Sequence, residues 1–487
     1  MNPQKSYLCS METADYISIA ILTMFVLCAG MASFRRGAGS RGFFSAEGTL
    51  PWWMSGLSLF MGFFSAGTFV VWGSIAYTSG WVAVVIQWTM CLAGVITGIF
   101  IAPRWHKTAV LTPAGYISGR FGVRTQKFYT ILFLLLSLFN SGVFLYPVGV
   151  VLHVSTGLSL PSCIILVCIL SITYVTIGGL KAVAVTDVLQ FLILMTGVAV
   201  TVPLALARTG GLHSWVAALP EHFFSATSGE WTPLFLLSFA VYNTVLLGGN
   251  WGFVQRFTSV KTPSDARKAS FLFSALYFVC PILWMLPPMI YRAIDPSLNG
   301  LADENAYLMI CKAVLPAGLL GLMLLGIVCA TMSSLNSILN VTSAVITDEV
   351  YRRLKPASSE RELMTVARLT IIMAGLLSMC IALSIPHLGG VVNVVVSIAA
   401  LTGAPLYLPV IWSLFSRCQT SFSLMSVTLS SMAVNVFFKF VLPSLSGHHL
   451  SRGMEMFIGV SVPVLLLAVW EIWCRIRTSS GMIPRLP

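Results

Sequence analysis

The chain has 487 residues, of which 57% are hydrophobic and only 9% are charged, and its formal net charge is +12. A soluble domain carries about 25% charged residues, so this composition excludes a water-soluble protein and indicates a polytopic membrane protein. The basic charge could suggest a nucleic-acid partner, and the positions of the charges decide that question.

The apolar segments predict about thirteen membrane-spanning helices, since a helix needs about 20 apolar residues to cross a bilayer. The first follows Glu12 and Asp15, precedes Arg35 and Arg36, and has no basic segment before it. We therefore interpret it as a retained span rather than a cleaved signal peptide, with Met11 as an alternative start of the protein. The predicted spans lie near residues 14–34, 53–80, 81–103, 127–155, 161–178, 183–207, 232–255, 269–291, 315–348, 362–386, 390–416, 420–445 and 454–474.

Lysine and arginine gather in alternate connecting loops. One set of loops holds clusters such as Arg35-Arg36 and Arg352-Arg353, whereas the loops between them hold few basic residues, among them Arg208. By the positive-inside rule, the N-terminus lies outside the cell membrane and the C-terminus lies in the cytoplasm. The basic charge is therefore topological, and nothing remains to support nucleic-acid binding.

Two predicted helices contain glycines that favour a break. Residues 53–80 include Gly62 and Gly67, and residues 232–258 include Gly248-Gly249-Asn250. Unwound backbone in a membrane is tolerated only where it lines a cavity. Close helix packing is the alternative explanation for small residues in such helices.

The two glycine-containing helices lie at matching places, because each opens a block of about five helices. The blocks start on opposite sides of the membrane, which is typical of inverted-topology repeats with a binding site near the midplane. We predict five segments: an N-terminal tail, first helix and basic loop (1–52), a first repeat (53–207), an outer loop (208–231), a second repeat (232–416), and two C-terminal helices with a short tail (417–487).

One stretch of the chain resembles the signature of the sodium:solute symporter family, the carriers of sugars, proline, pantothenate and sialic acid. It runs Gly178-Gly179-Leu180-Lys181-Ala182-Val183 and continues with Thr186-Asp187 and Gln190. Asn250-Trp251 with Gln255-Arg256, Ser334-Leu335-Asn336-Ser337 and Asp348-Glu349-Val350-Tyr351 support it. The resemblance covers nearly the whole chain. It implies an all-α, LeuT-like core of five plus five inverted-repeat helices, with discontinuous first and sixth core helices.

A sodium site is expected on the predicted helix 315–348. Ser333 and Ser334 lie one turn beyond Ala330, so one face can offer the Ala330 carbonyl and two hydroxyls. Alternatively, each serine bonds its own i−4 carbonyl, as serines in membrane helices often do. The resemblance implies that the carbonyls of Met61 and Phe64 on the first broken helix are the facing ligands.

The resemblance also implies a possible second sodium position at Asp187, Ser333, Asn336 and Ser337. Ser333 and Ser337 share a helix face at i, i+4, but Asn336 stands where a serine is expected. For Asp187 a helix N-cap remains open as the alternative, since Thr186-Asp187 lies at the start of a predicted helix.

The resemblance to the family's sugar carriers implies a substrate pocket of uncharged polar residues and an inner gate at Leu246. This set favours a neutral or zwitterionic solute, and its members are Thr68, Gln87, Asn243, Tyr277 and Ser397.

The chain shows no nucleophile–base pair, metal-ligand spacing or Walker loop, so enzymatic activity and ATP-driven transport are not expected. The expected function is symport of a small polar solute with sodium into the cell by alternating access. The alternative is a membrane sensor or receptor that binds a solute without net transport.

Overall fold

The computed structural model of the protein describes residues 11–32, 48–110, 112–388, 403–446 and 450–479. Within these ranges the chain forms helices and no β-strand, apart from two isolated bridge pairs. Eight helices in the described ranges are long and apolar enough to cross a membrane, or up to ten if each of two bent pairs is one span. The protein is therefore an all-α, multi-pass membrane protein, as predicted. The count of about thirteen spans stays a prediction, and residues 389–402 of the predicted span 390–416 lie outside the described residues.

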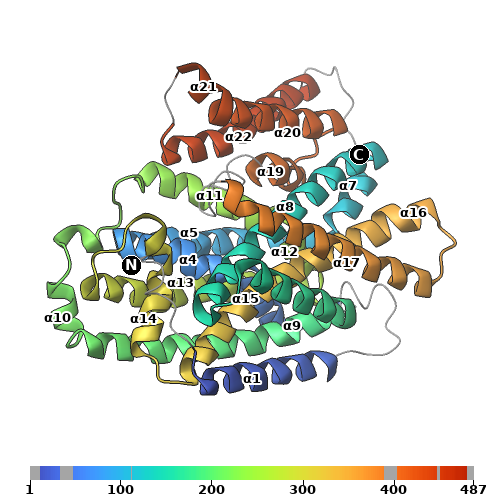
Figure 1. Ribbon diagram of the computed structural model, residues 1–487. Coiled ribbons are helices and arrows are strands. Elements are labelled where there is room, and N and C mark those ends of the chain that lie inside the picture. The colour runs from blue at the N-terminus through green and yellow to red at the C-terminus, as the bar shows by residue number, and fades with distance from the viewer. Residues whose placement is uncertain (1–10, 33–47, 111, 389–402, 447–449, 480–487) are drawn as a thin grey trace.

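The helices follow one another along the whole described chain and carry the labels of Figure 1. In chain order they are α1 (Thr13–Ala32), α3 (Trp52–Phe63), α4 (Ala66–Ser79), α5 (Val82–Ile96), α6 (Ala102–Lys107), α7 (Pro113–Phe121), α8 (Val123–Thr156), α9 (Leu160–Arg208), α10 (Leu212–Ala217), α11 (Pro233–Gly249), α12 (Trp251–Thr258), α13 (Pro263–Ile294), α14 (Ala306–Val314), α15 (Leu319–Ala344), α16 (Arg352–Leu354), α17 (Glu360–Ser384), α19 (Ala404–Ser413), α20 (Ser421–Val436), α21 (Leu442–Ser446) and α22 (Arg452–Ser479).

Helix α15 lies at the centre of the bundle. Its span is 83% buried, whereas the span of α22 is only 22% buried. Figure 1 shows α20, α21 and α22 as a separate layer on one side of the bundle and α1 on the opposite side. A helix that is surrounded on all faces can hold polar groups away from lipid, so α15 is the natural place for a buried polar site.

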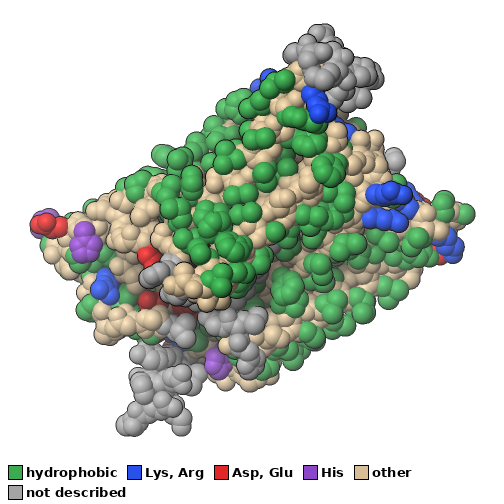
Figure 2. All heavy atoms as spheres, turned by 90° about the horizontal axis from the view of Figure 1, so that it is seen from above, with side chains coloured by type: hydrophobic (Ala, Val, Ile, Leu, Met, Phe, Trp, Pro, Cys, Tyr) green, Lys and Arg blue, Asp and Glu red, His purple; other side chains and the backbone are tan. Residues whose placement is uncertain are grey.

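The surface carries an apolar band. Figure 2 shows hydrophobic side chains over the middle of the face, with charged side chains mainly toward the two ends. Large side chains such as Leu237, Leu429 and Val469 are more than half exposed. An apolar exposed band of this kind is expected where lipid rather than water covers the protein.

Both predicted breaks are present. The α3–α4 pair bends by 62° and the α11–α12 pair bends by 57°. The first break falls at Phe64 and Ser65, between Gly62 and Gly67 as predicted.

The prediction that Gly248-Gly249 is non-helical is wrong. Helix α11 continues through Gly249, and Asn250 takes the extended conformation instead. The two glycines serve packing, because a Cβ on Gly248 would lie 2.8 Å from Ile101 and a Cβ on Gly249 would lie 2.5 Å from Tyr407. Small residues at these positions let the helices approach closely.

A second correction concerns the predicted spans 161–178 and 183–207. They belong to one helical run, α9, which continues from Leu160 to Arg208 without a loop between them. Leu180, Val183 and Ala184 just after the glycine pair are fully buried, and tertiary packing overrides the low helix propensity of glycine here. Asp187 therefore lies inside a helix, and the alternative that it is a helix N-cap is wrong.

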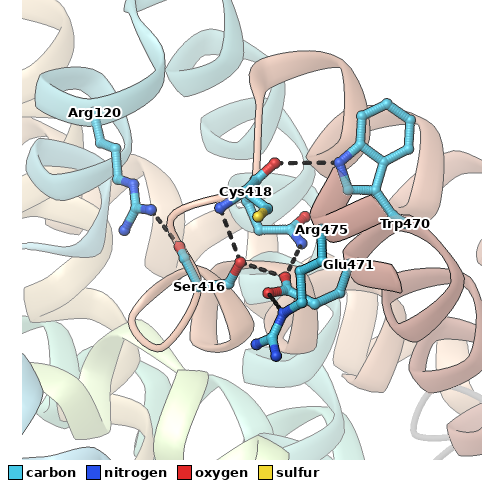
Figure 3. A network of polar contacts seen from close by, with 7 residues as sticks. Arg120, Ser416, Cys418, Trp470, Glu471 and Arg475 are labelled. Atoms are coloured by element: carbon cyan, nitrogen blue, oxygen red, sulfur yellow. Dashed lines mark hydrogen bonds and ion pairs between the residues drawn. The ribbon is translucent and has the colours of Figure 1, made fainter. Parts of the chain in front are cut away.

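A polar network joins α7 to the C-terminal helices (Figure 3). The Arg120 guanidinium donates to the carbonyls of Ser413, the last residue of α19, and of Ser416 just after it. The Ser416 hydroxyl donates to Glu471 on α22, and Trp470 Nε1 donates to the Cys418 carbonyl at 3.3 Å. These contacts hold the chain after α19 between the first predicted repeat and the last helix.

Candidate functional site

The first break removes backbone hydrogen bonds from the end of α3. Phe64 and Ser65 have ψ angles of 134° and 173°, so the helical ladder stops there. The Ser65 N–H donates to the Thr68 hydroxyl at 3.3 Å instead of to the Met61 carbonyl. The Thr68 N–H donates to the Ser65 carbonyl at 2.9 Å instead of to Phe64. The Phe64 carbonyl has therefore lost its helical donor.

Helix α15 takes part in the break directly. The Ala66 N–H donates to the hydroxyl of Thr331 at 2.7 Å, so the Gly62 carbonyl also loses its helical partner. Backbone carbonyls at the end of a helix need another partner when they are buried. The carbonyls of Met61, Gly62 and Phe64 meet α15 at this point.

Ser334 places its hydroxyl among these carbonyls. Its Oγ lies 2.6 Å from the Phe64 carbonyl, 3.1 Å from Gly62 and 3.4 Å from Met61. The Ala330 carbonyl on the same helix lies 3.5 Å from the hydroxyl. Four of the five residues predicted for the first sodium site therefore lie together.

The cluster is rich in oxygen and poor in protons. Met61, Phe64, Ala330 and Ser334 are fully buried, and a serine hydroxyl has a single proton to donate. The Met61 carbonyl accepts from the Phe64 N–H at 3.1 Å and Ala330 lies within the continuous helix α15, so the hydroxyl proton is shared between the Gly62 and Phe64 carbonyls, which lost their helical donors. A small hard cation prefers such an all-oxygen set and binds it at about 2.3–2.6 Å, taking the range of other hard cations.

The fifth predicted residue, Ser333, turns to a different partner. Its hydroxyl donates to Asp187 Oδ1 at 2.5 Å, and the Ser58 hydroxyl donates to Asp187 Oδ2 at 2.5 Å. Asp187, Ser58 and Ser333 are fully buried. The carboxylate of α9 thus joins α3 to α15 directly behind the carbonyl cluster.

Arg256 on α12 belongs to the same cluster. It is fully buried, and its Nε donates to Ser58 at 3.0 Å while Nη2 donates to Ser337 at 2.5 Å. The Ser58 hydroxyl therefore bridges the guanidinium and the Asp187 carboxylate. Both broken helices and α9 contribute to this buried charge pair.

The residues predicted for the second sodium position are only partly assembled. The Ser337 hydroxyl accepts from Arg256 and donates to the Ser333 carbonyl at 2.8 Å. Asn336 is buried, and its Oδ1 has no hydrogen-bond partner within the described part of the chain. Asp187 contacts Ser333, whereas the Ser337 hydroxyl is hydrogen-bonded to the Arg256 guanidinium and does not face a free space.

Two predicted substrate residues are buried polar groups. The Thr68 hydroxyl accepts from the Ser65 N–H and completes the capping box of α4. Asn243 on α11 is fully buried, and its Nδ2 donates to Thr89 on α5 at 2.8 Å. Its Oδ1 has no partner among the described residues, so it retains capacity to accept a hydrogen bond.

The other residues of the predicted pocket that the structure describes make no hydrogen bond to this amide. Tyr277 on α13 packs in an aromatic group, with its ring centroid 4.7 Å from Phe273 and 5.0 Å from Phe60. Gln87 on α5 is buried, and Leu246, the predicted gate, is half-buried on α11. Ser397 lies outside the described residues.

The sequence analysis predicted no site role for three residues of this region: Ser58, Arg256 and Thr331. The Gln255-Arg256 pair was visible as part of the resemblance, and an arginine within an apolar stretch is a signal in itself. Ser58 and Thr331 had no comparable signal, because their partners lie 129 and 265 residues away.

Comparison with known proteins shows which family the chain belongs to. Residues 43–429 match the sodium:solute symporter family. The chain belongs to this family. The symporter is 27% identical to the sodium/glucose cotransporter of Vibrio parahaemolyticus, over 88% of this chain and 85% of that protein. It is 26% identical to the sodium/sialic acid symporter SiaT of Proteus mirabilis, over 74% of this chain and 77% of that protein.

A solved structure shares its fold. This symporter matches a substrate-bound outward-open state of a Na⁺-coupled sialic acid symporter with a TM-score of 0.83 at 21% identity, over 96% of this chain and 98% of that chain. Family and fold together confirm the predicted fold class. The protein is a sodium-coupled solute symporter and not an enzyme.

Proposed function

We propose that this symporter carries a small polar solute, neutral or zwitterionic, into the cell together with sodium by alternating access. The observation that carries the proposal is the position of Ser334. Its hydroxyl on α15 lies among carbonyls released by the break of α3. Sodium bound there would hold the two predicted repeats together, and its loss would let them separate.

The proposed sodium ligands are the carbonyls of Met61, Phe64 and Ala330 and the hydroxyl of Ser334. Ser333 supports them through Asp187, and its hydroxyl can turn to the ion when sodium enters. The inward sodium gradient and the membrane potential drive uptake, and one charge moving through 100 mV provides about 2.3 kcal/mol.

Two hydrogen bonds join the start of α3 to the end of α12. The Leu50 N–H donates to the Ser259 carbonyl at 3.1 Å, and the Ser55 hydroxyl donates to the Arg256 carbonyl at 2.9 Å. We assign this end to the cytoplasm, since the basic loops lie on this side, with the N-terminus outside and the C-terminus inside. Release of solute and sodium requires α3 and α12 to separate here.

The side chains proposed to bind the solute are uncharged, and this favours an uncharged or zwitterionic solute. Thr68, Gln87, Asn243 and Tyr277 offer hydroxyls and amides, and Asn243 Oδ1 has spare capacity to accept a hydrogen bond. The similar proteins are named for glucose and for sialic acid. Without an arginine in this set, a neutral polyhydroxylated or zwitterionic solute fits better than an anion.

Uptake into proteoliposomes tests the proposal. Radiolabelled glucose, proline and sialic acid would be offered under an inward sodium gradient with an inside-negative potential, with potassium or choline replacing sodium as controls. We expect sodium-dependent accumulation of a neutral or zwitterionic solute. Asn243→Ala should raise the KM for that solute about tenfold, since a lost hydrogen bond in a buried site costs about 1–3 kcal/mol. Solute binding without accumulation would contradict transport.

A further inference from the structure

Two cysteines that lie far apart in the sequence meet near the end of α22. Cys418 follows α19 and precedes α20, and Cys474 lies on α22. Their thiols are hydrogen-bonded to each other, and neither forms a disulfide within the described part of the chain. Both side chains are half-buried rather than enclosed. Because a disulfide requires two sulfurs at short range, this pair can form one without a large movement of the backbone.

Backbone contacts hold Cys418 against α22. Its N–H donates to the Ser416 hydroxyl at 3.0 Å, and its carbonyl accepts from Trp470 Nε1 at 3.3 Å (Figure 3). The Ser416 hydroxyl donates in turn to Glu471 on α22. Cys474 lies one turn beyond Trp470, so it shares the helix face that holds Cys418. The contact between the two thiols is therefore supported by the backbone of the segment after α19 and not only by the cysteine side chains.

The two thiols have different parts in an oxidation. Burial raises the pKa of the Cys418 thiol to about 12, and its hydrogen bond with Cys474 acts in the same direction. Cys418 therefore keeps its proton at neutral pH. Because oxidants react with the thiolate rather than with the thiol, Cys474 is the sulfur that an oxidant attacks first, and Cys418 is the partner that reacts with the product.

We propose that Cys418 and Cys474 form a dithiol on the cytoplasmic side that hydrogen peroxide converts into a disulfide, which joins α22 to the chain after α19. The Cys474 thiolate attacks one oxygen of the peroxide, so an S–O bond forms, the O–O bond breaks, and the hydroxide released takes up the proton that Cys474 lost. The Cys418 sulfur then attacks the sulfenic acid, an S–S bond forms, and the S–O bond breaks as water leaves with the Cys418 proton. The two thiols lose two electrons, and one peroxide becomes two water molecules.

A disulfide at this place is expected to be reversible, since cytoplasmic thiols are kept reduced and disulfides there are usually catalytic or redox-sensing. The inference goes beyond the proposed transport function and takes from it only the orientation in the membrane. The segment after α19 is also held by Arg120 of α7, through the carbonyls of Ser413 and Ser416. The new bond would tie α22 to this segment and would restrict the unfolded chain between the two cysteines. We therefore expect the oxidised protein to unfold at a higher temperature than the reduced protein.

Peptide mapping of the purified full chain tests the inference without any solute or sodium gradient. The protein in detergent is treated with dilute hydrogen peroxide, its free thiols are blocked with N-ethylmaleimide, and size-exclusion chromatography verifies that it stays folded. Trypsin cleaves after Arg417 and Arg475, so the two cysteines lie in separate peptides with one cysteine each, 418–439 and 453–475. We expect mass spectrometry to find these peptides joined after peroxide and separate again after dithiothreitol.

Single variants separate the two roles. In Cys418→Ser no second thiol is present, so peroxide should leave a sulfenic acid on Cys474 that dimedone traps, whereas Cys474→Ser should leave Cys418 unlabelled. Neither variant should show the rise in unfolding temperature that peroxide gives the wild type. A folded wild type whose two peptides stay separate would overturn the inference even if no variant folds, and so would an oxidised wild type that unfolds at a lower temperature. None of these readouts involves sodium or solute, so such a failure would leave the proposed function standing.

Discussion

The Ser334 hydroxyl has one proton and lies within 3.5 Å of four carbonyl oxygens. In most membrane helices a buried serine instead donates to its own i−4 carbonyl, as Ser378 does to Ala374 at 2.8 Å. Ser334 faces the broken end of α3 rather than only its own helix. This difference between the two serines is the reason for proposing an ion site at Ser334 and ordinary helix packing at Ser378.

Ser334→Ala should raise the sodium concentration that gives half-maximal transport by about tenfold or more, which corresponds to ~1.4 kcal/mol. The expected cause is the loss of the one side-chain oxygen in the cluster. Ser378→Ala is the matched control, because it removes an equally buried hydroxyl that bonds only within its helix. Equal sodium dependence in the two variants would contradict the site.

Asp187 and Arg256 should be strongly coupled in stability. Asp187→Asn leaves the guanidinium as an uncompensated buried charge, which costs about 3–5 kcal/mol, so thermal unfolding should begin at a clearly lower temperature. Combining it with Arg256→Gln removes both charges and should recover part of this loss. The coupling energy from the double-mutant cycle is the readout, and additive effects of the two changes would show that the residues do not act as a pair.

The residues of the first site were within reach of the sequence, whereas their partners were not. Met61 and Phe64 follow from the resemblance, and Ala330 and Ser334 follow from their one-turn spacing on the same helix face. The network of Arg256 with Ser58 spans 198 residues along the chain, and no local pattern gives such a pairing. The position of a buried charge can be read from a sequence, but its partner depends on packing.

The two broken helices differ in how the break is satisfied. At the second break, Trp105 Nε1 donates to the Gly248 carbonyl at 2.7 Å, and Asn250 Oδ1 accepts from the Gly252 N–H at 3.0 Å. Side chains thus provide partners for this backbone, whereas the α3 break leaves carbonyls facing α15. We therefore propose the α3–α4 pair as the ion-binding element, while α11–α12 provides Asn243 and Arg256.

The sequence located both breaks but did not resolve their form. The Gly248-Gly249 pair predicted unwinding and two separate spans were predicted on either side of residues 179–182, but the backbone is helical at both places. Glycine permits a break without requiring one, since packing around it decides the backbone. Asn250, whose side chain caps the next helix, marks the second break more closely than the glycines do.

Gly249→Ala should destabilise the protein, because its Cβ would lie 2.5 Å from Tyr407 Cβ and neither helix can move away easily. We expect a loss of about 1–3 kcal/mol, typical of overpacking. Gly119→Ala on α7 is the matched control, since nothing lies within 4 Å of its Cβ, and it should be neutral or slightly stabilising. Thermal unfolding in detergent measures both, and equal stability would contradict the packing role.

The contact between α3 and α12 should act as a gate. Leu50 and Val260 form an isolated parallel bridge beside the Leu50–Ser259 hydrogen bond. Cysteines introduced at Leu50 and Val260 should form a disulfide on mild oxidation and stop transport while leaving sodium binding intact. A reducing agent should restore transport, and the single-cysteine variants are controls. Full transport by the cross-linked protein would show that this contact does not open.

At the scale of the whole molecule, the proposed sodium site lies where the two predicted repeats meet. Helix α15 lies in the second predicted block (232–416) and the broken α3 in the first (53–207), and α15 is the most enclosed of the spans described. A cation between them couples ion binding to the relative position of two large bodies. The uncharged residues predicted to bind the solute belong to other helices of the same bundle, so the proposed ion and solute sites share one bundle.

The location of sodium in an experimental map tests this account most directly. Cryo-electron microscopy of the purified protein in saturating sodium, compared with the same protein in potassium, should show a density peak at about 2.3–2.6 Å from the carbonyls of Met61, Phe64 and Ala330 and from the Ser334 hydroxyl. A sodium-dependent peak elsewhere, or a Ser334 hydroxyl still bonded to the Phe64 carbonyl in saturating sodium, would contradict the account.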